Sequence, residues 1–497
     1  MQSETLADTA WDVVIEGTGL PQSLLALALS RSGKKILHVD RNDYYGGNEA
    51  SLGLTEAEEW AVKHVGAQSK DAAFSHAVLK KLEGTGEIKL GRPRAYELSL
   101  APQLLYSRSF LLDAVVSSQI HNQLDFQAVG SWFVVDTATG GLVTVPGSRE
   151  DIFRDDKINM KAKRALMKLL RSLNAEDADQ VWAQEASMSF TTVLEQKFGL
   201  PTTLHAPILA LAMTTEPPQS TTADFAVPRI MRHLRSIGMH APGCPALLQR
   251  YGGLAEIIQV ACRANAVGGG VYVLGTGITT VHSTDENKLS IALDNGEQIS
   301  TRWLVTASSH EQAVPDNSAE KSRSEVSKSI SVVASPLTAL FQPLAAGAVT
   351  PAGAIVLIPG EAETDPPAYI FAHSSDSGEC PSGQSVLYAS IAAGHEYGYA
   401  RLDLAVSTLL SALDAESSPE VLWCLQYQQD YAATSSTSQH SSQVVRLHPV
   451  PAGMVLEDSV LEDVKAAWLR IVDGEDSDSF MSFAAREGTT DDDDEDT

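Results

Sequence analysis

The sequence predicts an α/β fold with two parts: a large domain with a Rossmann-type core, like that of FAD- and NAD(P)-binding proteins, and a smaller all-helical domain. Three observations lead to this prediction. Residues 11–47 have the strand–glycine turn–helix–strand order of a dinucleotide-binding unit. Residues 279–308 alternate apolar runs with turn residues, which predicts an inserted β meander. Between 160 and 237, apolar residues recur at helical spacing.

The first segment contains an altered phosphate-binding turn. Gly17 and Gly19 form a tight turn after an apolar strand, and Asp40 ends the second strand, where a ribose-binding acid would lie. Gln22 stands where a G-x-G-x-x-G motif has its third glycine. That glycine leaves phosphates a clear path to the helix N-terminus. We therefore expect no cofactor, and we interpret Gly17, Gly19 and Asp40 as remnants of a cofactor site.

The other segments predict the division of the chain into domains. We expect a discontinuous large domain over 1–147 and 241–472, a helical domain over 148–240, and an acidic disordered tail over 473–497. In chain order, the expected elements are a helical stretch at 54–83, mixed helix and strand at 94–135, a hairpin at 137–146, helices at 160–173, 187–199, 205–213 and 228–237, a helix at 254–266, a strand at 271–274, the meander, a polar loop at 311–330, strands at 331–341, 354–358, 367–372 and 386–392, a helix at 402–414, a loop at 432–443 and a helix at 459–472.

Charge and composition exclude several classes of protein. The chain has 63 acidic and 36 basic residues and a net charge of −27. Contact with nucleic-acid phosphates requires clustered Lys and Arg, so no nucleic acid is expected as a partner. No apolar run is long enough to predict a membrane span, and no signal peptide is visible at the N-terminus. Four scattered cysteines without metal-ligand spacing predict no metal site and fit the reducing cytoplasm.

The sequence contains no recognisable catalytic centre but two candidate interaction surfaces. It lacks a G-x-S-x-G elbow, a P-loop, an H-E-x-x-H motif and the late Gly-Asp segment of flavin enzymes, so we expect no catalytic residue. Tyr44 and Tyr45 precede a Gly-Gly turn, and Glu256, Gln259 and Arg263 share one face of a predicted helix between glycine-rich loops. These features fit a packed loop and a solvated helix face, or a protein-binding surface.

Together, these two segments resemble the superfamily of Rab GDP-dissociation inhibitors (GDI) and Rab escort proteins. The resemblance rests on GTGL, GKKILHVDRN and YYGG in the first segment and on YGGLAEIIQ with its following arginine in the second. Residues 91–94 and 123–126 also fit, and the likeness spans nearly the whole chain. VPGSREDIF, PRIMRHLRSIGM and the acidic tail are more similar to the fungal escort-protein branch. Residues 255–260 depart from the Gly-Glu-Leu-Pro-Gln-Gly run of GDI-like sequences.

The resemblance implies an accessory protein and not an enzyme. An escort protein, or component A of Rab geranylgeranyltransferase, would bind GDP-bound Rab, present it to the transferase αβ dimer and deliver the geranylgeranylated product to membranes. It would be cytoplasmic, with transient membrane association. Two alternatives remain: a Rab GDI that extracts and recycles prenylated Rabs, and an FAD-dependent oxidoreductase.

The resemblance also implies which residues bind these partners. It assigns a Rab-binding platform to Tyr45, Arg92, Arg94, Glu256, Gln259 and Arg263. It implies an apolar patch for the Rab C-terminus, which we expect within 109–124. The candidate lipid-facing residues lie in the helical domain, and each of them could instead be ordinary helix core: Leu166, Leu170, Leu194, Leu209, Met231 and Leu234.

Overall fold

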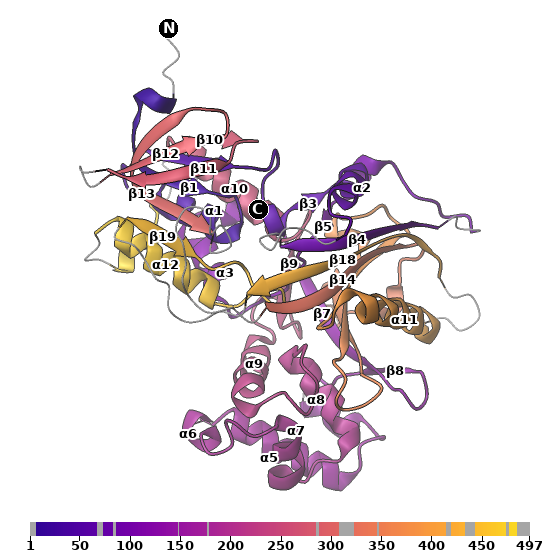
Figure 1. The fold of residues 1–497 in the computed structure, drawn as a ribbon. Coiled ribbons are helices and arrows are strands. Elements are labelled where there is room, and N and C mark those ends of the chain that lie inside the picture. The colour runs from indigo at the N-terminus through magenta and orange to yellow at the C-terminus, as the bar shows by residue number, and fades with distance from the viewer. Residues whose placement is uncertain are drawn as a thin grey trace, which may run out of the picture.

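The computed structural model shows two sheets side by side with a helical region below them (Figure 1). It describes residues 6–66, 73–82, 86–147, 149–175, 178–284, 288–307, 323–344, 347–413, 419–432, 443–473 and 477–484. In this part of the chain, no helix combines the length and the hydropathy that a membrane span needs.

The first sheet is the predicted Rossmann-type sheet, which confirms the α/β fold class. Its strand order is β10 (Val271–Leu274), β2 (Ile36–Asp40), β1 (Ala10–Glu16), β13 (Gln298–Ala307), β12 (Leu289–Leu293) and β11 (Ile278–Ser283), and β19 (Val444–Leu447) also pairs with β13. The pairs β10–β2, β2–β1 and β1–β13 are parallel, whereas β11, β12 and β13 form the antiparallel meander. A buried apolar cluster joins this sheet to four helices: α1 (Leu20–Leu29), α3 (Phe110–Ser117), α10 (Leu254–Val267) and α12 (Ser459–Ile471).

The second sheet is larger and mostly antiparallel. Its strands, in order, are β4 (Phe74–Lys81), β18 (Val421–Ala432), β14 (Arg323–Val333), β17 (Ser385–Ile391), β16 (Ala368–Ser374), β15 (Gly353–Ile358), β7 (Phe126–Val135), β9 (Ala246–Gln249) and β6 (Leu105–Tyr106), and β8 (Leu142–Thr144) pairs with β7. The helix α11 (His395–Leu413) packs on β14, β16 and β17. The helix α2 (Leu54–Lys63) contacts β4, beside a short pair formed by β3 (Ser51–Leu52) and β5 (Leu98–Ser99).

Two segments of this sheet differ from the sequence prediction. The helical stretch predicted over 54–83 ends at Lys63, and β4 follows as a strand paired with β18. The loop predicted over 311–330 is wrong from Arg323 onward, where β14 begins. Ser327, Lys328 and Ser329 are buried between β17 and β18, so sheet pairing overrides their polar character.

In its described residues, the helical region contains six α-helices between Arg149 and Ser236. They are α4 (Arg149–Arg154), α5 (Met160–Leu173), α6 (Ala178–Trp182), α7 (Phe190–Val193), which continues as a π-helical turn (Leu194–Phe198), α8 (His205–Ala212) and α9 (Ala223–Ser236). The side chain of Asn159 caps α5 by accepting a hydrogen bond from the Ala162 amide. Leu166, Leu169 and Leu173 form the apolar stripe of α5 and enter a separate buried cluster.

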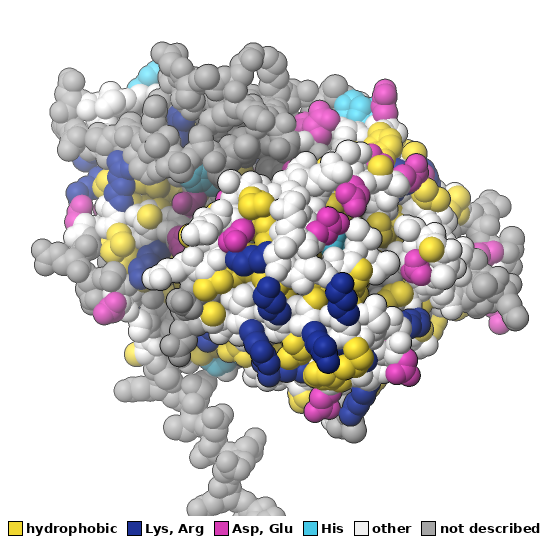
Figure 2. All heavy atoms as spheres, turned by 90° about the horizontal axis from the view of Figure 1, so that it is seen from below, with side chains coloured by type: hydrophobic (Ala, Val, Ile, Leu, Met, Phe, Trp, Pro, Cys, Tyr) yellow, Lys and Arg dark blue, Asp and Glu magenta, His cyan; other side chains and the backbone are white. Residues whose placement is uncertain are grey.

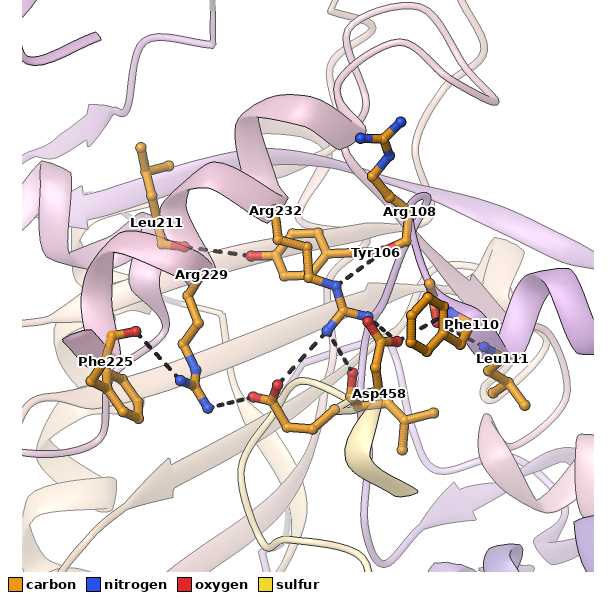
Figure 3. Close-up of polar contacts among 12 residues, drawn as sticks. Tyr106, Arg108, Phe110, Leu111, Leu211, Phe225, Arg229, Arg232 and Asp458 are labelled. Carbon is orange, nitrogen blue, oxygen red and sulfur yellow. Dashed lines mark hydrogen bonds and ion pairs between the residues drawn. The ribbon is translucent and has the colours of Figure 1, made fainter. Parts of the chain in front are cut away.

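An ion-pair network joins α9 to the loop before α12 (Figure 3). Arg232 donates to the carbonyls of Arg108 and Leu456 and forms an ion pair of 2.9 Å with Asp458. Arg229 pairs with Glu457 at 2.7 Å, and Glu457 also lies 3.7 Å from Arg232. The network therefore connects the helical region to the element that packs against the first sheet.

Part of the segment predicted as an acidic tail packs against the core. Phe480 and Phe483 pack against the core around α1 and α12, and Met481 is buried within it. The Phe483 amide donates to the Ser117 carbonyl, and the Arg31 guanidinium lies 4.4 Å from the centroid of the Phe483 ring. Burial of these apolar side chains outweighs the charge of their neighbours. The acidic run of the predicted tail lies outside the described residues.

Candidate functional site

The phosphate-binding position of the Rossmann-type sheet is filled by the protein's own side chains. Glu49 lies at the N-terminus of α1, where its Oε2 accepts a hydrogen bond of 3.0 Å from the Leu20 amide. A Cβ added to Gly19 would lie 2.9 Å from Gln22 Oε1 and 3.0 Å from Glu49 Oε2. In FAD- and NAD-binding proteins this helix terminus holds the pyrophosphate. A phosphate here would have to displace the Glu49 side chain, so the residues of this turn do not fit a dinucleotide.

Asp40 has a structural role in the same turn. Its Oδ2 accepts hydrogen bonds from the amide and hydroxyl of Thr18, at 2.7 and 2.6 Å. The Thr18 hydroxyl in turn accepts from the Gly46 amide at 3.0 Å. Gly46 has φ +100°, and a Cβ there would lie 2.9 Å from Ala50 Cα, so glycine is required. Asp40, at the position of the ribose-binding acid in dinucleotide-binding proteins, thus holds the loop that carries Tyr45.

We predict that Glu49→Ala lowers the free energy of unfolding by about 1–3 kcal/mol, because it leaves the buried Leu20 amide without an acceptor. Glu49→Gln keeps an acceptor and should cost less. Urea denaturation measures both changes, with the exposed Glu59→Ala as the control. An unchanged midpoint for Glu49→Ala would show that the amide is satisfied without Glu49.

The outer face of α10 carries the predicted polar stripe. Gln259 and Arg263 are exposed and Glu256 is half-buried, while the intervening apolar residues enter the core. Burial raises the pKa of Glu256, and the charge of Arg263 opposes that rise. Tyr45 lies near this helix: burial and the nearby Cys262 of α10 both raise the pKa of Tyr45, and its ring centroid lies 5.9 Å from that of Tyr272 on β10. The structure therefore brings Tyr45 to the helix that presents the stripe.

Arg92 and Arg94 lie on an exposed loop that the buried Tyr96 anchors. Tyr96 is fully buried; its hydroxyl accepts from the Gly91 amide and donates to Gln384 Oε1, both at 2.7 Å. The next residue, Glu97, lies close enough to Glu256 for their charges to interact: burial, Glu56 and Glu256 all raise the pKa of Glu97. Glu97 therefore lies near both the arginine loop and the start of α10. The six predicted residues do not form one cluster of direct contacts.

Sequence reasoning left out two residues next to this surface, Arg250 and Tyr251. Tyr251 is 47% exposed, and the Arg250 guanidinium lies 4.7 Å from its ring centroid. Tyr251, Gly252 and Gly253 all have positive φ, which turns the chain sharply into α10. A Cβ at Gly252 would lie 2.4 Å from the Ser51 hydroxyl. The Tyr-Gly-Gly triplet was visible in the sequence and could have identified Tyr251.

The helical region contains an apolar pocket of about 330 Å³. Leu166, Leu170 and Leu234, all predicted as lipid-facing, line it. Leu194, Leu209 and Met231 do not line it; they are at most 9% exposed and belong to the core of the region. The pocket is otherwise lined by Val145, Pro146, Gly147, Arg149, Ile152, Ile158, Leu169, Leu173, Asn174, Leu204, Pro207, Ile208, Leu211, Ile230 and Ile237. Leu169 and Leu173 could have been included, because they follow the same helical spacing as Leu166.

Two further hollows lie near these sites. One, of about 740 Å³, shares Val145–Gly147 with the apolar pocket and is lined partly by charged residues of α4. The other, of about 460 Å³, lies between α3 and α12 and is walled by Phe480. Phe110 and Val116, both at least half exposed, lie on the outer face of α3 on either side of the exposed Asp113, within the segment 109–124. Phe480 was missed because it lies in the segment predicted as a tail.

A family model and relatives of known name match most of this chain. The GDP dissociation inhibitor family matches residues 7–355. A Saccharomyces cerevisiae protein named Rab proteins geranylgeranyltransferase component A is 28% identical over 82% of this chain, and its Drosophila melanogaster counterpart 27% identical over 82%. The matches span 66% of the yeast protein and 79% of the fly protein.

Solved structures show the same fold. The crystal structure of Rab GDI from Plasmodium falciparum has a TM-score of 0.68 and 18% identity, covering 93% of this chain and 98% of that one. A putrescine oxidase bound to putrescine has a TM-score of 0.54 and 14% identity, covering 94% and 100%. The oxidase thus shares the architecture, while the family match distinguishes this chain from it. The chain belongs to the GDP dissociation inhibitor family.

Proposed function

We propose that this protein is a Rab escort protein: it binds GDP-bound Rab, presents it to Rab geranylgeranyltransferase and carries the prenylated product to membranes. The observation that carries the proposal is the apolar pocket in the helical region of a chain from this family. A pocket of about 330 Å³ is within the range of ligand-binding cavities.

The physical requirements of such a carrier fit the two surfaces. A geranylgeranyl chain has roughly twenty carbons, and burial stabilises it by about 0.8 kcal/mol per CH₂, so an apolar pocket can compete with a membrane. The surface of Tyr45, α10 and the arginine loop is polar and exposed, as a surface that contacts GTPase switch loops would be. Switch loops differ in order between the GDP and GTP states. A protein that prefers the GDP state must raise the affinity of the Rab for GDP, by linkage.

The escort role is favoured over the GDI role by the extent of the matches. The yeast and fly proteins named component A match over 82% of this chain, whereas the yeast protein named Rab GDP-dissociation inhibitor matches over 56%. In this role the chain is an accessory subunit and catalyses no reaction itself. Its partners are the Rab, the lipid on the Rab and the transferase αβ dimer, and we expect it in the cytoplasm with transient membrane association. We also propose that the domain boundaries follow the helical region, at 148 and 240.

The decisive test is Rab prenylation in vitro with the transferase, with and without the full chain. Prenylation that depends on the chain supports the escort role. Equal modification of Rab in both reactions excludes it, and extraction of prenylated Rab from membranes would then identify a GDI. A visible flavin absorbance band in the purified protein would overturn both roles.

We predict that Tyr45→Ala and Arg263→Ala each weaken binding of unmodified Rab·GDP about tenfold, since exposed aromatic and arginine side chains dominate many interfaces. Both side chains are at least partly exposed, so the fold should be retained. Titration of labelled Rab·GDP measures the affinity, with the exposed Lys35→Ala as the control. Wild-type affinity in both variants would remove these residues from the platform.

A further inference from the structure

The helix α5 carries a row of basic side chains on its outer face. Its fourteen residues include no acid, although the whole chain has 63 acidic and 36 basic residues. Lys161, Arg164, Lys168 and Arg171 are all exposed and follow the spacing of one helix face. We call these four residues the basic stripe. In the view from below, Lys and Arg side chains gather on this face of the molecule (Figure 2).

Most of the stripe has no acidic partner. In the part of the chain that the structure describes, no carboxylate lies within 4.0 Å of the charged groups of Lys161, Arg164 or Arg171. Lys168 is held differently: its Nζ donates to the Lys197 carbonyl at 2.8 Å and lies 5.4 Å from the centroid of the Phe198 ring. Like charges three and four residues apart repel one another and destabilise a helix. The stripe therefore has an electrostatic cost that an anionic partner would remove.

Apolar side chains flank the stripe. Met160, at the start of α5, is 60% exposed, and Phe153, at the end of α4, is 55% exposed. Lys163 Nζ donates to the Phe153 carbonyl at 2.7 Å, which ties the end of α4 to α5. Yellow apolar surface lies among the basic side chains in Figure 2. Exposed apolar residues beside a row of Lys and Arg are typical of helices that lie on membrane surfaces.

We propose that the basic stripe docks the helical region on an anionic lipid bilayer, with Met160 and Phe153 entering its interfacial layer. A chain of net charge −27 is repelled by an anionic membrane unless a basic face is turned toward it. The opposite face of α5, with Leu166 and Leu170, lines the apolar pocket. Docking would thus bring the pocket close to the bilayer. The purpose of this docking rests on the proposed function, but vesicle binding itself requires neither Rab nor transferase.

An acidic protein surface is the competing occupant. Such a partner would also pair with the cations and pack on Met160 and Phe153, since protein interfaces are enriched in Arg, Met and aromatic residues, but it would not draw the chain onto protein-free vesicles. A bilayer uses both, because anionic headgroups attract the cations and the acyl boundary accepts the apolar side chains. Binding to vesicles should therefore depend on charge and on these two side chains together.

The test is co-sedimentation of the full chain with vesicles of phosphatidylcholine alone or with roughly 30% phosphatidylserine. We expect at least about fivefold more binding to the anionic vesicles in about 50 mM salt, and much less in about 300 mM salt, because salt screens exposed charges. Lys161→Gln/Arg164→Gln/Arg171→Gln should lose at least about fivefold of this binding. Met160→Ser/Phe153→Ser should also weaken it.

The matched control removes the same charge elsewhere. Lys34→Gln/Lys35→Gln/Lys288→Gln changes bases near the first sheet and leaves the stripe intact. It should bind anionic vesicles like the wild type, and thermal melts should show that both triple variants fold. Equal vesicle binding by the stripe variant and the wild type, or equal loss in both triple variants, would overturn the proposal. If the stripe variant kept vesicle binding but lost Rab prenylation, the stripe would serve the transferase. Failure of prenylation with the wild type would affect only the proposed function.

Discussion

Arg232→Ala is expected to lower the free energy of unfolding by about 3 kcal/mol, near the low end of the cost of breaking a buried ion pair. The Arg232 side chain is only 14% exposed and serves two carbonyls and the carboxylate of Asp458 (Figure 3). Without it, Glu457 keeps Arg229 as its ion-pair partner among the described residues, and Asp458 loses the cation that Arg232 provides. Urea denaturation followed by far-UV circular dichroism measures the loss.

Substitutions of two other arginines give smaller expected losses of stability for comparison. Arg229 has a more exposed side chain and one ion pair, with its guanidinium 3.7 Å from the centroid of the Phe225 ring, so Arg229→Ala should cost about half as much. Arg154 and its partner Glu150 are both 77% exposed, and Arg154→Ala should change stability by less than about 0.5 kcal/mol. Equal effects for Arg232→Ala and Arg154→Ala would show that the network does not hold the helical region in place.

The sequence predicts those parts of the fold whose local pattern agrees with their final environment. Strand β1 reads as apolar and is buried in a parallel sheet, and α5 reads as amphipathic and packs by one face. Strand β14 could not be predicted, because Ser327 and Lys328 are buried only by virtue of their neighbours on β17 and β18. Polar residues in the middle of a sheet carry no local signal of their burial.

The candidate sites also differ in how far one segment of sequence predicts them. The polar face of α10 and the tyrosine loop can be predicted from the spacing of residues within one segment. Glu49 could not be assigned, because its contact with Leu20 joins residues 29 positions apart. The apolar pocket needs Val145 and Pro146 from the end of the hairpin as well as the helices, so the sequence recovers only part of its wall, namely Leu166 and Leu170 on α5 and Leu234 on α9. Residues that meet through tertiary packing have to be read from the structure.

Leu170→Trp is expected to weaken binding of geranylgeranylated Rab by about 100-fold while leaving binding of unmodified Rab·GDP unchanged. Leu170 is half-buried and lines the apolar pocket, so an indole there occupies volume that the lipid needs. Exclusion of roughly four methylenes costs about 3 kcal/mol, which corresponds to a factor of about 100 in affinity. Fluorescence titration with prenylated and unprenylated Rab separates the two contributions.

The control for this prediction lies on the same helix. Met167 is half-buried on α5 but is not among the residues that line the pocket, so Met167→Trp adds similar bulk elsewhere. It should leave both affinities near those of the wild type. Weaker binding of both Rab forms by Leu170→Trp would indicate a distorted helical region, and unchanged binding of prenylated Rab would place the lipid outside this pocket. Only a selective loss by Leu170→Trp supports the pocket as the lipid site, because bulk and helix position are matched between the two variants.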